Sequence, residues 1–358
     1  MTFVHVISRK PSLSRILSAM IAMAGFASPS FANDDAAQVE SFYRDKQFRM
    51  QVGSAAGSAY DLAARTLAKH IAHHIPGTPS VIVQNVPGAG SFTLANQLYS
   101  IAPRDGSVIG AVINGVPTGP LLRPDITRFD PTKFNWIGSI NRDSQVFIVS
   151  STSPVQSLEQ LRDKRIVVGG TTVGTSNVDF PLALTSVLGL QFRIVSGYES
   201  SRYVVLAMER GEVDGNAGTG WSTLNAQSQD QLRAGKIKII GQYGLNRHPA
   251  LPDVPLVLDL ARSEEERQAL SLAFVRQEFG RSYFAPPDVP ATRVQALRRA
   301  FDATMKDDAF LTEAEKLRLD VEPSTGEEPT VLVNAIMNTT PSVASRVRDA
   351  LEASVARN

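Results

Sequence analysis

The sequence has no cysteine among its 358 residues. A disulfide framework, a thiolate metal site and a lipid attached to an N-terminal cysteine are therefore all excluded. There is also no excess of charge of either sign, because the sequence has 36 Lys and Arg residues and 35 Asp and Glu residues, which gives a net charge of +1. A chain this close to neutral lacks the electrostatic field that holds nucleic acid or an anionic membrane surface.

Long apolar runs are missing as well, apart from one short run near the N-terminus. Residues 16–26 are apolar, follow a basic segment and are too short to span a bilayer as a mature helix. Ser30 and Ala32 then give the small-x-small spacing of a signal-peptidase site. We therefore expect residues 1–32 to be a signal peptide and the mature chain to lie free in the periplasm, with no membrane insertion.

What the sequence does contain is a loop of small residues between a strand and a helix. Residues 48–52 are predicted to form the strand, and Ser54, Gly57 and Ser58 belong to the loop that follows. Ser58 stands at an N-cap position, and Asp61 follows at capping-box spacing. Because a bare loop before a helix offers free N–H groups and the positive end of the helix dipole, it predicts an anion-binding turn.

Two series of strands alternate with loops and helices along the mature chain. The first series has predicted strands at residues 48–52, 80–85 and 108–113. The second has predicted strands at residues 146–150, 165–169, 192–195, 212–216 and 236–240, and a small-residue loop at 170–177. Apolar strands in such units predict parallel sheets that are covered by helices on both faces. Because open α/β sheets bind ligands at the carboxyl ends of strands, one loop from each series is expected at a shared cleft.

The rest of the chain is predicted to be mainly helical. Its expected helices lie at residues 263–274, 292–305, 328–338 and 342–356. These helices can return to pack on the first series of strands. We therefore expect lobe 1 to comprise residues 33–144 plus 245–358, and lobe 2 to comprise residues 145–244.

Some weaker signals point to other chemistry. Residues 88–93 resemble a dinucleotide fingerprint but lack its last glycine and follow the second strand, so we predict no nucleotide cofactor. His70, His73 and His74 have the spacing of metal ligands on one helix face, although imidazoles also favour a solvated helix C-terminus, and we predict no metal. Since neither a Gly-x-Ser-x-Gly elbow nor a catalytic-triad order occurs, we predict that the protein is not an enzyme.

Several motifs occur in a recognisable order. They are Gly-Ser-Ala-Tyr-Asp at 57–61, Val-Gln-Asn-Val-Pro-Gly-Ala-Gly at 83–90, Ala-Pro-Arg-Asp-Gly at 102–106, Val-Gly-Gly-Thr-Thr-Val-Gly-Thr-Ser-Asn at 168–177, Gly-Glu-Val-Asp at 211–214 and Ala-Pro-Pro-Asp-Val-Pro at 285–290. Over residues 40–325 this pattern resembles the receptor component of tripartite tricarboxylate transporters, the Bug-type periplasmic solute-binding proteins. The chain departs from the common pattern at residues 56–58, where Pro-Gly-Gly is usual, and at Val86 and Ser91, where Arg and Gly are frequent.

The resemblance implies an α/β fold of the type II periplasmic-binding-protein kind, with two α/β lobes and a ligand cleft between them. It implies capture of a small organic carboxylate and delivery to the membrane components of a tripartite tricarboxylate transporter. We also expect a monomer without cofactors. The expected ligand-binding residues are Ser54, Gly57, Ser58, Tyr60, Asp61, Asn85, Pro87, Gly88, Ala89, Asn114, Thr118, Thr172, Gly174, Thr175, Ser176 and Asp214.

Two other functions stay open at this point. The same fold serves an exported receptor that presents its ligand to a sensor histidine kinase, and the same scaffold serves an exported hydrolase. A hydrolase requires a nucleophile with a base in reach, which the sequence does not show. Tyr60 and Trp221 are equally compatible with stacking on an aromatic acid and with packing in the core.

Overall fold

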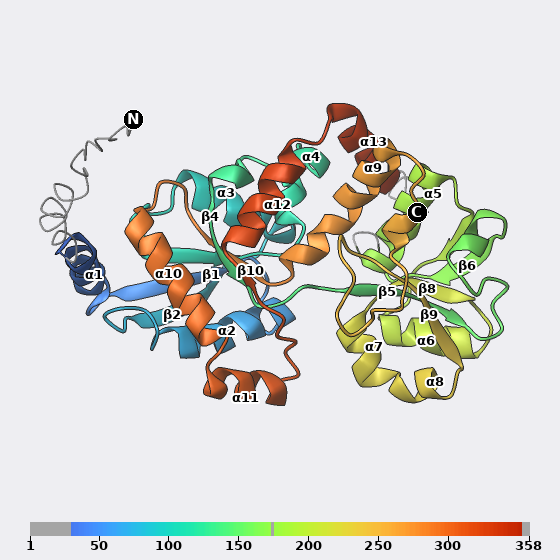
Figure 1. Cartoon of the computed structure of the whole chain (residues 1–358), viewed down its shortest axis with the longest axis horizontal. Coiled ribbons are helices and arrows are strands. Elements are labelled where there is room, and N and C mark those ends of the chain that lie inside the picture. Colours follow the sequence, from blue (N-terminus) through green and yellow to red (C-terminus); the bar gives the residue numbers. More distant parts are fainter. Residues whose placement is uncertain (1–29, 173–174, 353–358) are drawn as a thin grey trace, which may run out of the picture.

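The computed structural model of the protein describes residues 30–172 and 175–352. Most of the predicted signal peptide, residues 1–29, and the predicted binding residue Gly174 lie outside these ranges. Within them, no helix is both long enough and apolar enough to cross a bilayer. The described chain forms two α/β lobes that lie side by side (Figure 1).

The first lobe is built on a mixed sheet. Its strands are β1 (Gln47–Val52), β2 (Ser80–Asn85), β3 (Val108–Ala111), β4 (Asn135–Ser139), β10 (Ser282–Ala285) and β11 (Ser324–Thr325). They form a six-stranded sheet in the order β11-β4-β10-β3-β1-β2. The first three strands are the predicted ones, and they pair in parallel as expected. The sheet as a whole is mixed, because β10 returns from the other lobe and pairs antiparallel with both β3 and β4.

The second lobe contains the remaining strands. They are β5 (Gln145–Ser150), β6 (Ile166–Gly169), β7 (Phe192–Val195), β8 (Gly215–Gly220) and β9 (Ile237–Gln242). They form a five-stranded sheet in the order β7-β6-β8-β5-β9, in which β6 pairs in parallel with β7 and β8. This sheet is also mixed, because β5 runs antiparallel to both β8 and β9.

The strand predicted at residues 212–216 was wrong in its position. β8 begins only at Gly215 and has the sequence Gly-Asn-Ala-Gly-Thr-Gly, which is poor in the residues that favour strands. In the folded chain these small residues pack against the start of α5 (Ser176–Leu188). A Cβ at Gly218 would lie 2.6 Å from the backbone carbonyl carbon of Ser176. The glycines of β8 therefore allow the start of a helix to approach the sheet closely.

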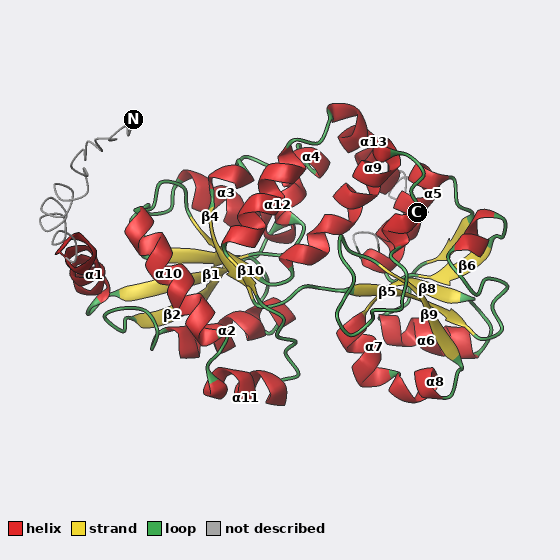
Figure 2. Ribbon diagram, in the orientation of Figure 1, coloured by secondary structure: helices red, strands yellow, loops and turns green. Residues whose placement is uncertain are grey.

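Helices cover both faces of each sheet (Figure 2). The helices of the first lobe are α1 (Ser30–Tyr43), α2 (Ala59–Ile71), α3 (Phe92–Ser100), α4 (Gly119–Leu122), α10 (Ala291–Thr304), α11 (Asp308–Lys316) and α12 (Glu327–Met337). Those of the second are α5 (Ser176–Leu188), α6 (Ser201–Glu209), α7 (Trp221–Gln227) and α8 (Gln229–Arg233). Two more helices, α9 (Glu264–Phe274) and α13 (Pro341–Glu352), pack against α5.

Two segments of the chain cross between the lobes side by side. The first, residues 140–144, leads from β4 to β5, and the second, residues 275–281, leads from α9 to β10. The N–H of Asp143 donates to the carbonyl of Gln277 at 2.8 Å and joins the two segments. Helix α13 is a further bridge, since it contacts α4 of the first lobe and α5 of the second (Figure 1). The predicted lobe boundaries stay a prediction, and they assign α9 and α13 to lobe 1 although both helices contact α5.

Aromatic side chains pack at the base of the crossing segments. The indole of Trp136 lies 5.7 Å from the ring centroid of Phe279 and 5.0 Å from that of Phe284. On the side of the second lobe, Phe180 packs edge to face on Phe274 with centroids 5.0 Å apart. All five rings are fully buried. The apolar core therefore continues through the junction and fixes where the two crossing segments leave each lobe.

Candidate ligand-binding cleft

A polar cavity of about 340 Å³ lies between the two lobes. Its walls come from the second sheet, from the loop after β3, from the starts of α2 and α5 and from the crossing segments. The lining residues are Tyr60, Asn114, Asp143, Gln145, Thr171, Thr175, Ser176, Asn177, Ser201, Gly218, Gly220, Thr223 and Arg276. Of the residues predicted from the sequence, the fold brings together Tyr60, Asn114, Thr175 and Ser176 in this one cavity.

The first lobe contributes Tyr60 from the first turn of α2 and Asn114 from the loop after β3. The N–H of Asn114 donates to the phenol oxygen of Tyr60 at 3.4 Å, and the Asn114 side-chain amide donates to Asp143 at 3.3 Å. Burial, and then the charge of Asp143, raise the pKa of Tyr60 to about 12. The phenol therefore keeps its proton at neutral pH and is a hydrogen-bond donor for a ligand.

The second lobe contributes the loop that leads into α5. Thr175 is the N-cap residue of α5, and Ser176 is its first residue. The buried side-chain oxygen of Asn177 accepts hydrogen bonds from the N–H of Thr171 at 3.1 Å and from the hydroxyl of Thr175 at 2.7 Å. Asn177 thereby holds the loop against the helix start, so that the positive end of the α5 dipole lies at the wall of the cavity.

Arg276, on the second crossing segment, brings a positive charge to the cavity. Its guanidinium donates to the carboxylate of Asp179 at 3.0 Å and to the hydroxyl of Ser176 at 3.5 Å. It also lies 5.0 Å from the centroid of the Phe180 ring. Because a guanidinium carries five N–H donors in a planar fork, Arg276 keeps these contacts and still has donors for a carboxylate.

Asp143, on the first crossing segment, adds a carboxyl group to the cavity wall. The Gln145 side chain donates to its carboxylate at 3.1 Å. Burial raises the pKa of Asp143, while the charges of Arg281 and Arg276 act to lower it. Two arginines thus face two carboxylates, Asp143 and Asp179, in and beside the cleft. Their charges balance, so a bound anion depends on local donors instead of a net positive field.

The first small-residue loop is hydrogen-bonded to itself instead of lining the cavity. As predicted, Ser58 caps α2, because its hydroxyl oxygen accepts from the N–H of Asp61 at 3.2 Å. The Asp61 carboxylate accepts from the N–H of Gly57 at 2.8 Å and from the Asn85 amide at 2.8 Å. The hydroxyl oxygens of Ser54 and Ser58 are 2.7 Å apart. These five residues form one network at the ends of β1 and β2, and none of them is among the described residues that line the cavity.

Five more of the expected binding residues lie elsewhere. Pro87, Gly88 and Ala89 are exposed in the loop after β2, and Thr172 is exposed in the loop before α5. Thr118 lines a second, larger cavity between the lobes. The first four are absent from the lining of both cavities in the part of the chain that the structure describes.

Asp214 lies at the opposite end of the second sheet from the cleft. It immediately precedes β8, whose other end, Gly220, lines the cavity. Its carboxylate accepts a hydrogen bond from the N–H of Val167 at 2.8 Å, within the sheet. The expected position at the rim followed from the misplaced strand at 212–216, because a strand that ended there would have brought Asp214 to its carboxyl edge.

Ser91, which stands where glycine is frequent in this pattern, joins two strands of the first lobe. Its backbone is left-handed, with φ 73°. Its buried hydroxyl donates to the carbonyl of Gly53 at 2.9 Å and accepts from the N–H of Ile113 at 3.1 Å. The side chain thereby ties the ends of β1 and β3 beside the first loop.

Ser91→Ala is expected to lower the free energy of unfolding by about 2 kcal/mol, because two buried hydrogen bonds are lost. Ser91→Gly should lower it by less, since glycine adopts a positive φ without strain. Urea unfolding of both variants measures the difference. Equal stability of Ser91→Ala and the parent protein would show that the hydroxyl does not hold the two strands.

Arg276, Asp143, Gln145 and Arg281 were missed by the sequence analysis. They lie on or next to the two crossing segments, outside every motif that the sequence showed. One signal was present, because the two arginines stand within residues 269–285, a stretch that is otherwise largely apolar. A charged side chain in such a stretch is rarely buried without a partner or a role.

His70 of α2 and His74, three residues after the end of that helix, make contacts within the first lobe. His70 Nε2 is 2.8 Å from the carboxylate of Glu313, and His74 Nε2 is 2.8 Å from that of Asp307. The two contacts join α2 and the turn after it to the region of α11. Within residues 30–172 and 175–352, no group of His, Asp and Glu is arranged to hold a metal ion.

Comparison with known proteins identifies the family. The profile described as "Tripartite tricarboxylate transporter family receptor" matches residues 63–342. A UPF0065 protein of Cupriavidus necator is 29% identical over 252 residues, which are 67% of this chain and 73% of that protein. Among solved structures, a TctC solute-binding protein from Polaromonas is similar with a TM-score of 0.65 at 16% identity, over 86% of this chain and 98% of that one. An R. palustris protein solved with adipate gives a TM-score of 0.54 at 18% identity, over 84% and 97% of the two chains.

The profile covers most of the chain, with residues of both lobes and all of the cleft-lining residues except Tyr60. The similar solved structures share the two-lobed α/β architecture, which confirms the fold class expected from the sequence. This protein therefore belongs to the tripartite tricarboxylate transporter receptor family, a family of periplasmic solute-binding proteins.

Proposed function

We propose that this protein captures a small organic carboxylate in the periplasm and delivers it to the membrane components of a tripartite tricarboxylate transporter. One observation carries the proposal: donors from both lobes line the cavity of about 340 Å³. Tyr60 comes from the first lobe, the start of α5 from the second, and Arg276 from the segment between them. The R. palustris protein of similar fold was solved with adipate, a carboxylate.

The arrangement suits binding better than turnover. The Thr175 hydroxyl is hydrogen-bonded to Asn177, and the Ser176 hydroxyl accepts from Arg276, so neither has a general base beside it. No histidine occurs among the described residues that line the cavity. An exported hydrolase is therefore the less favoured alternative. A receptor that presents the same ligand to a sensor kinase uses the same cleft and differs only in its partner.

A binding screen tests the proposal. The mature chain, residues 33–358, is titrated with mono-, di- and tricarboxylates in thermal unfolding and calorimetry, and each mixture is analysed for products. A ligand at a hundred times its Kd should raise the free energy of unfolding by about 2.7 kcal/mol. Uptake by vesicles that contain the transporter's membrane components should then require the receptor. Consumption of the carboxylate by the purified protein would contradict the proposal.

Two serine variants separate the cleft from the first loop. Ser176→Ala should weaken carboxylate binding by about 1 kcal/mol, the usual value of one hydrogen bond, with little loss of stability. Ser58→Ala should instead lower the free energy of unfolding by about 1 kcal/mol, because it removes the cap of α2, and leave affinity unchanged. Calorimetry and urea unfolding of both variants give the comparison. The reverse pattern would show that the first loop, and not the cleft beside α5, holds the ligand.

A further inference from the structure

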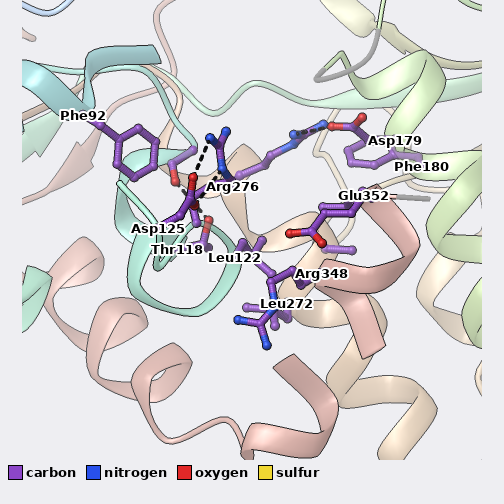
Figure 3. A pocket seen from close by; sticks show the side chains of 14 residues that line it. Phe92, Thr118, Leu122, Asp125, Asp179, Phe180, Leu272, Arg276, Arg348 and Glu352 are labelled. Atoms are coloured by element: carbon purple, nitrogen blue, oxygen red, sulfur yellow. Dashed lines mark hydrogen bonds and ion pairs between the residues drawn. The ribbon is translucent and has the colours of Figure 1, made fainter. Parts of the chain in front are cut away.

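A second cavity, of about 650 Å³, lies between the lobes next to the polar cleft (Figure 3). Apolar side chains from four elements line it, namely Phe92 of α3, Phe180 of α5, Leu122 of α4, and Leu272 and Ala273 of α9. Phe180 and Leu272 are almost fully buried. A lining of this kind at a pocket large enough for a small molecule favours an apolar ligand group.

The two cavities adjoin at three places. On α5, Ser176 lines the polar cleft, and Asp179 and Phe180 line the larger cavity one turn further along the same helix face. On the first lobe, Asn114 lines the cleft and its neighbour Gly115 lines the larger cavity. The third place is Arg276, which lines both. The cavities therefore form the polar and apolar halves of one groove, with the guanidinium at their junction.

Charge in the groove argues for a single carboxylate on the ligand. Arg276, the arginine that lines the polar half, is paired with Asp179, and the Asp143 carboxyl lines the same half, so acidic groups already offset this cation. The larger cavity is lined by three arginines, Arg123, Arg276 and Arg348, and by three carboxylates, Asp125, Asp179 and Glu352, and Arg123 is paired with Asp125. Because these charges are equal in number, burying a second carboxylate there would cost its hydration without a surplus of positive charge to offset it.

We propose that the ligand is a monocarboxylate with an apolar body, an acyl chain or an arene. Its carboxylate binds at the start of α5 beside Arg276, and its body fills the cavity between Phe92, Phe180 and Leu272. This inference rests on the proposed function, since it names the class of carboxylate that the receptor captures. It predicts that affinity follows the apolar length of the ligand and falls when a second acid group is added to the far end.

A homologous series tests this directly. Calorimetry is run on the mature chain with butanoate, hexanoate and octanoate, and with suberate, which has the chain length of octanoate and a carboxylate at each end. Each methylene that enters the cavity should strengthen binding by about fourfold. Suberate should bind at least about tenfold more weakly than octanoate. Equal or tighter binding of suberate or succinate would overturn the inference and leave the proposed function intact, whereas no binding by any carboxylate would overturn both.

A substitution in the larger cavity tests whether the acyl chain of the ligand binds there. Ala273→Leu adds apolar volume inside the larger cavity, so it should weaken octanoate binding by at least about tenfold and leave butanoate within about twofold. Ala309→Leu, the same change at an exposed position of α11, is the matched control and should alter neither affinity. Thermal unfolding confirms that both variants are folded. A loss that is equal for octanoate and butanoate, or absent for both, would show that the chain does not occupy this cavity.

Discussion

Arg276→Met is expected to weaken the binding of a monocarboxylate by about 10- to 100-fold. A hydrogen bond to a charged group contributes about 1.5–3 kcal/mol, and the variant removes the one guanidinium that lines the polar cavity among the described residues. Methionine keeps most of the apolar stem, so packing on Phe180 changes little. The measurement is calorimetry with octanoate and butanoate, both of which should lose affinity by a similar factor.

The same substitution also affects stability, because Asp179 is 5% exposed and loses its guanidinium partner. Breaking one side of a buried pair costs about 3–5 kcal/mol. The double variant Arg276→Met, Asp179→Asn removes both charges and should recover much of the free energy of unfolding without recovering affinity. If the double variant bound carboxylates as well as the parent protein, Arg276 would have no direct role in binding.

Asp61→Asn is expected to lower the free energy of unfolding by about 3 kcal/mol. The Asp61 carboxylate is buried and accepts from the N–H of Gly57, from Arg65 Nε at 3.0 Å and from the Asn85 amide. An asparagine presents one acceptor oxygen and places an NH₂ group against these donors. Since the network fixes the start of α2, the loss should appear as a lower urea midpoint with an unchanged slope.

The stability that the Asp61 carboxylate contributes should depend on pH. Burial acts to raise the pKa of Asp61, but the hydrogen bonds from Arg65, Gly57 and Asn85 outweigh it and hold the pKa below its usual value. A carboxyl with a lowered pKa stabilises the fold at pH values above its unfolded-state pKa, and this contribution is lost as the pH falls toward the folded-state pKa. The parent protein should therefore lose stability below about pH 4.

The Asp61→Asn variant should not show this loss of unfolding free energy at acid pH. The matched control is Asp253→Asn, an exposed carboxylate without an ion pair in the described ranges, which should keep both the stability and the acid profile of the parent protein. Urea midpoints between pH 3 and pH 7 give the comparison. An acid profile of Asp61→Asn that matched the parent's would show that Asp61 is not held as a buried anion.

The sequence by itself determined the local elements of this protein. The cap at Ser58 and the strand segments β1, β2 and β3 depend on neighbouring residues, so short-range patterns predict them. The family resemblance rests on the same local motifs. They were sufficient to expect two α/β lobes and a loop from each at a cleft.

Only the tertiary structure decided which of these loops faces the cleft and with which partners. The first loop was expected to bind an anion, yet Asp61 and Asn85 occupy its donors, because β2 returns beside β1 and brings Asn85 within reach. Arg276 and Asp143 reach the cleft because two segments far apart in the sequence cross between the lobes together. Such placement depends on long-range packing, and no pattern of adjacent residues encodes which distant side chain a local donor will meet.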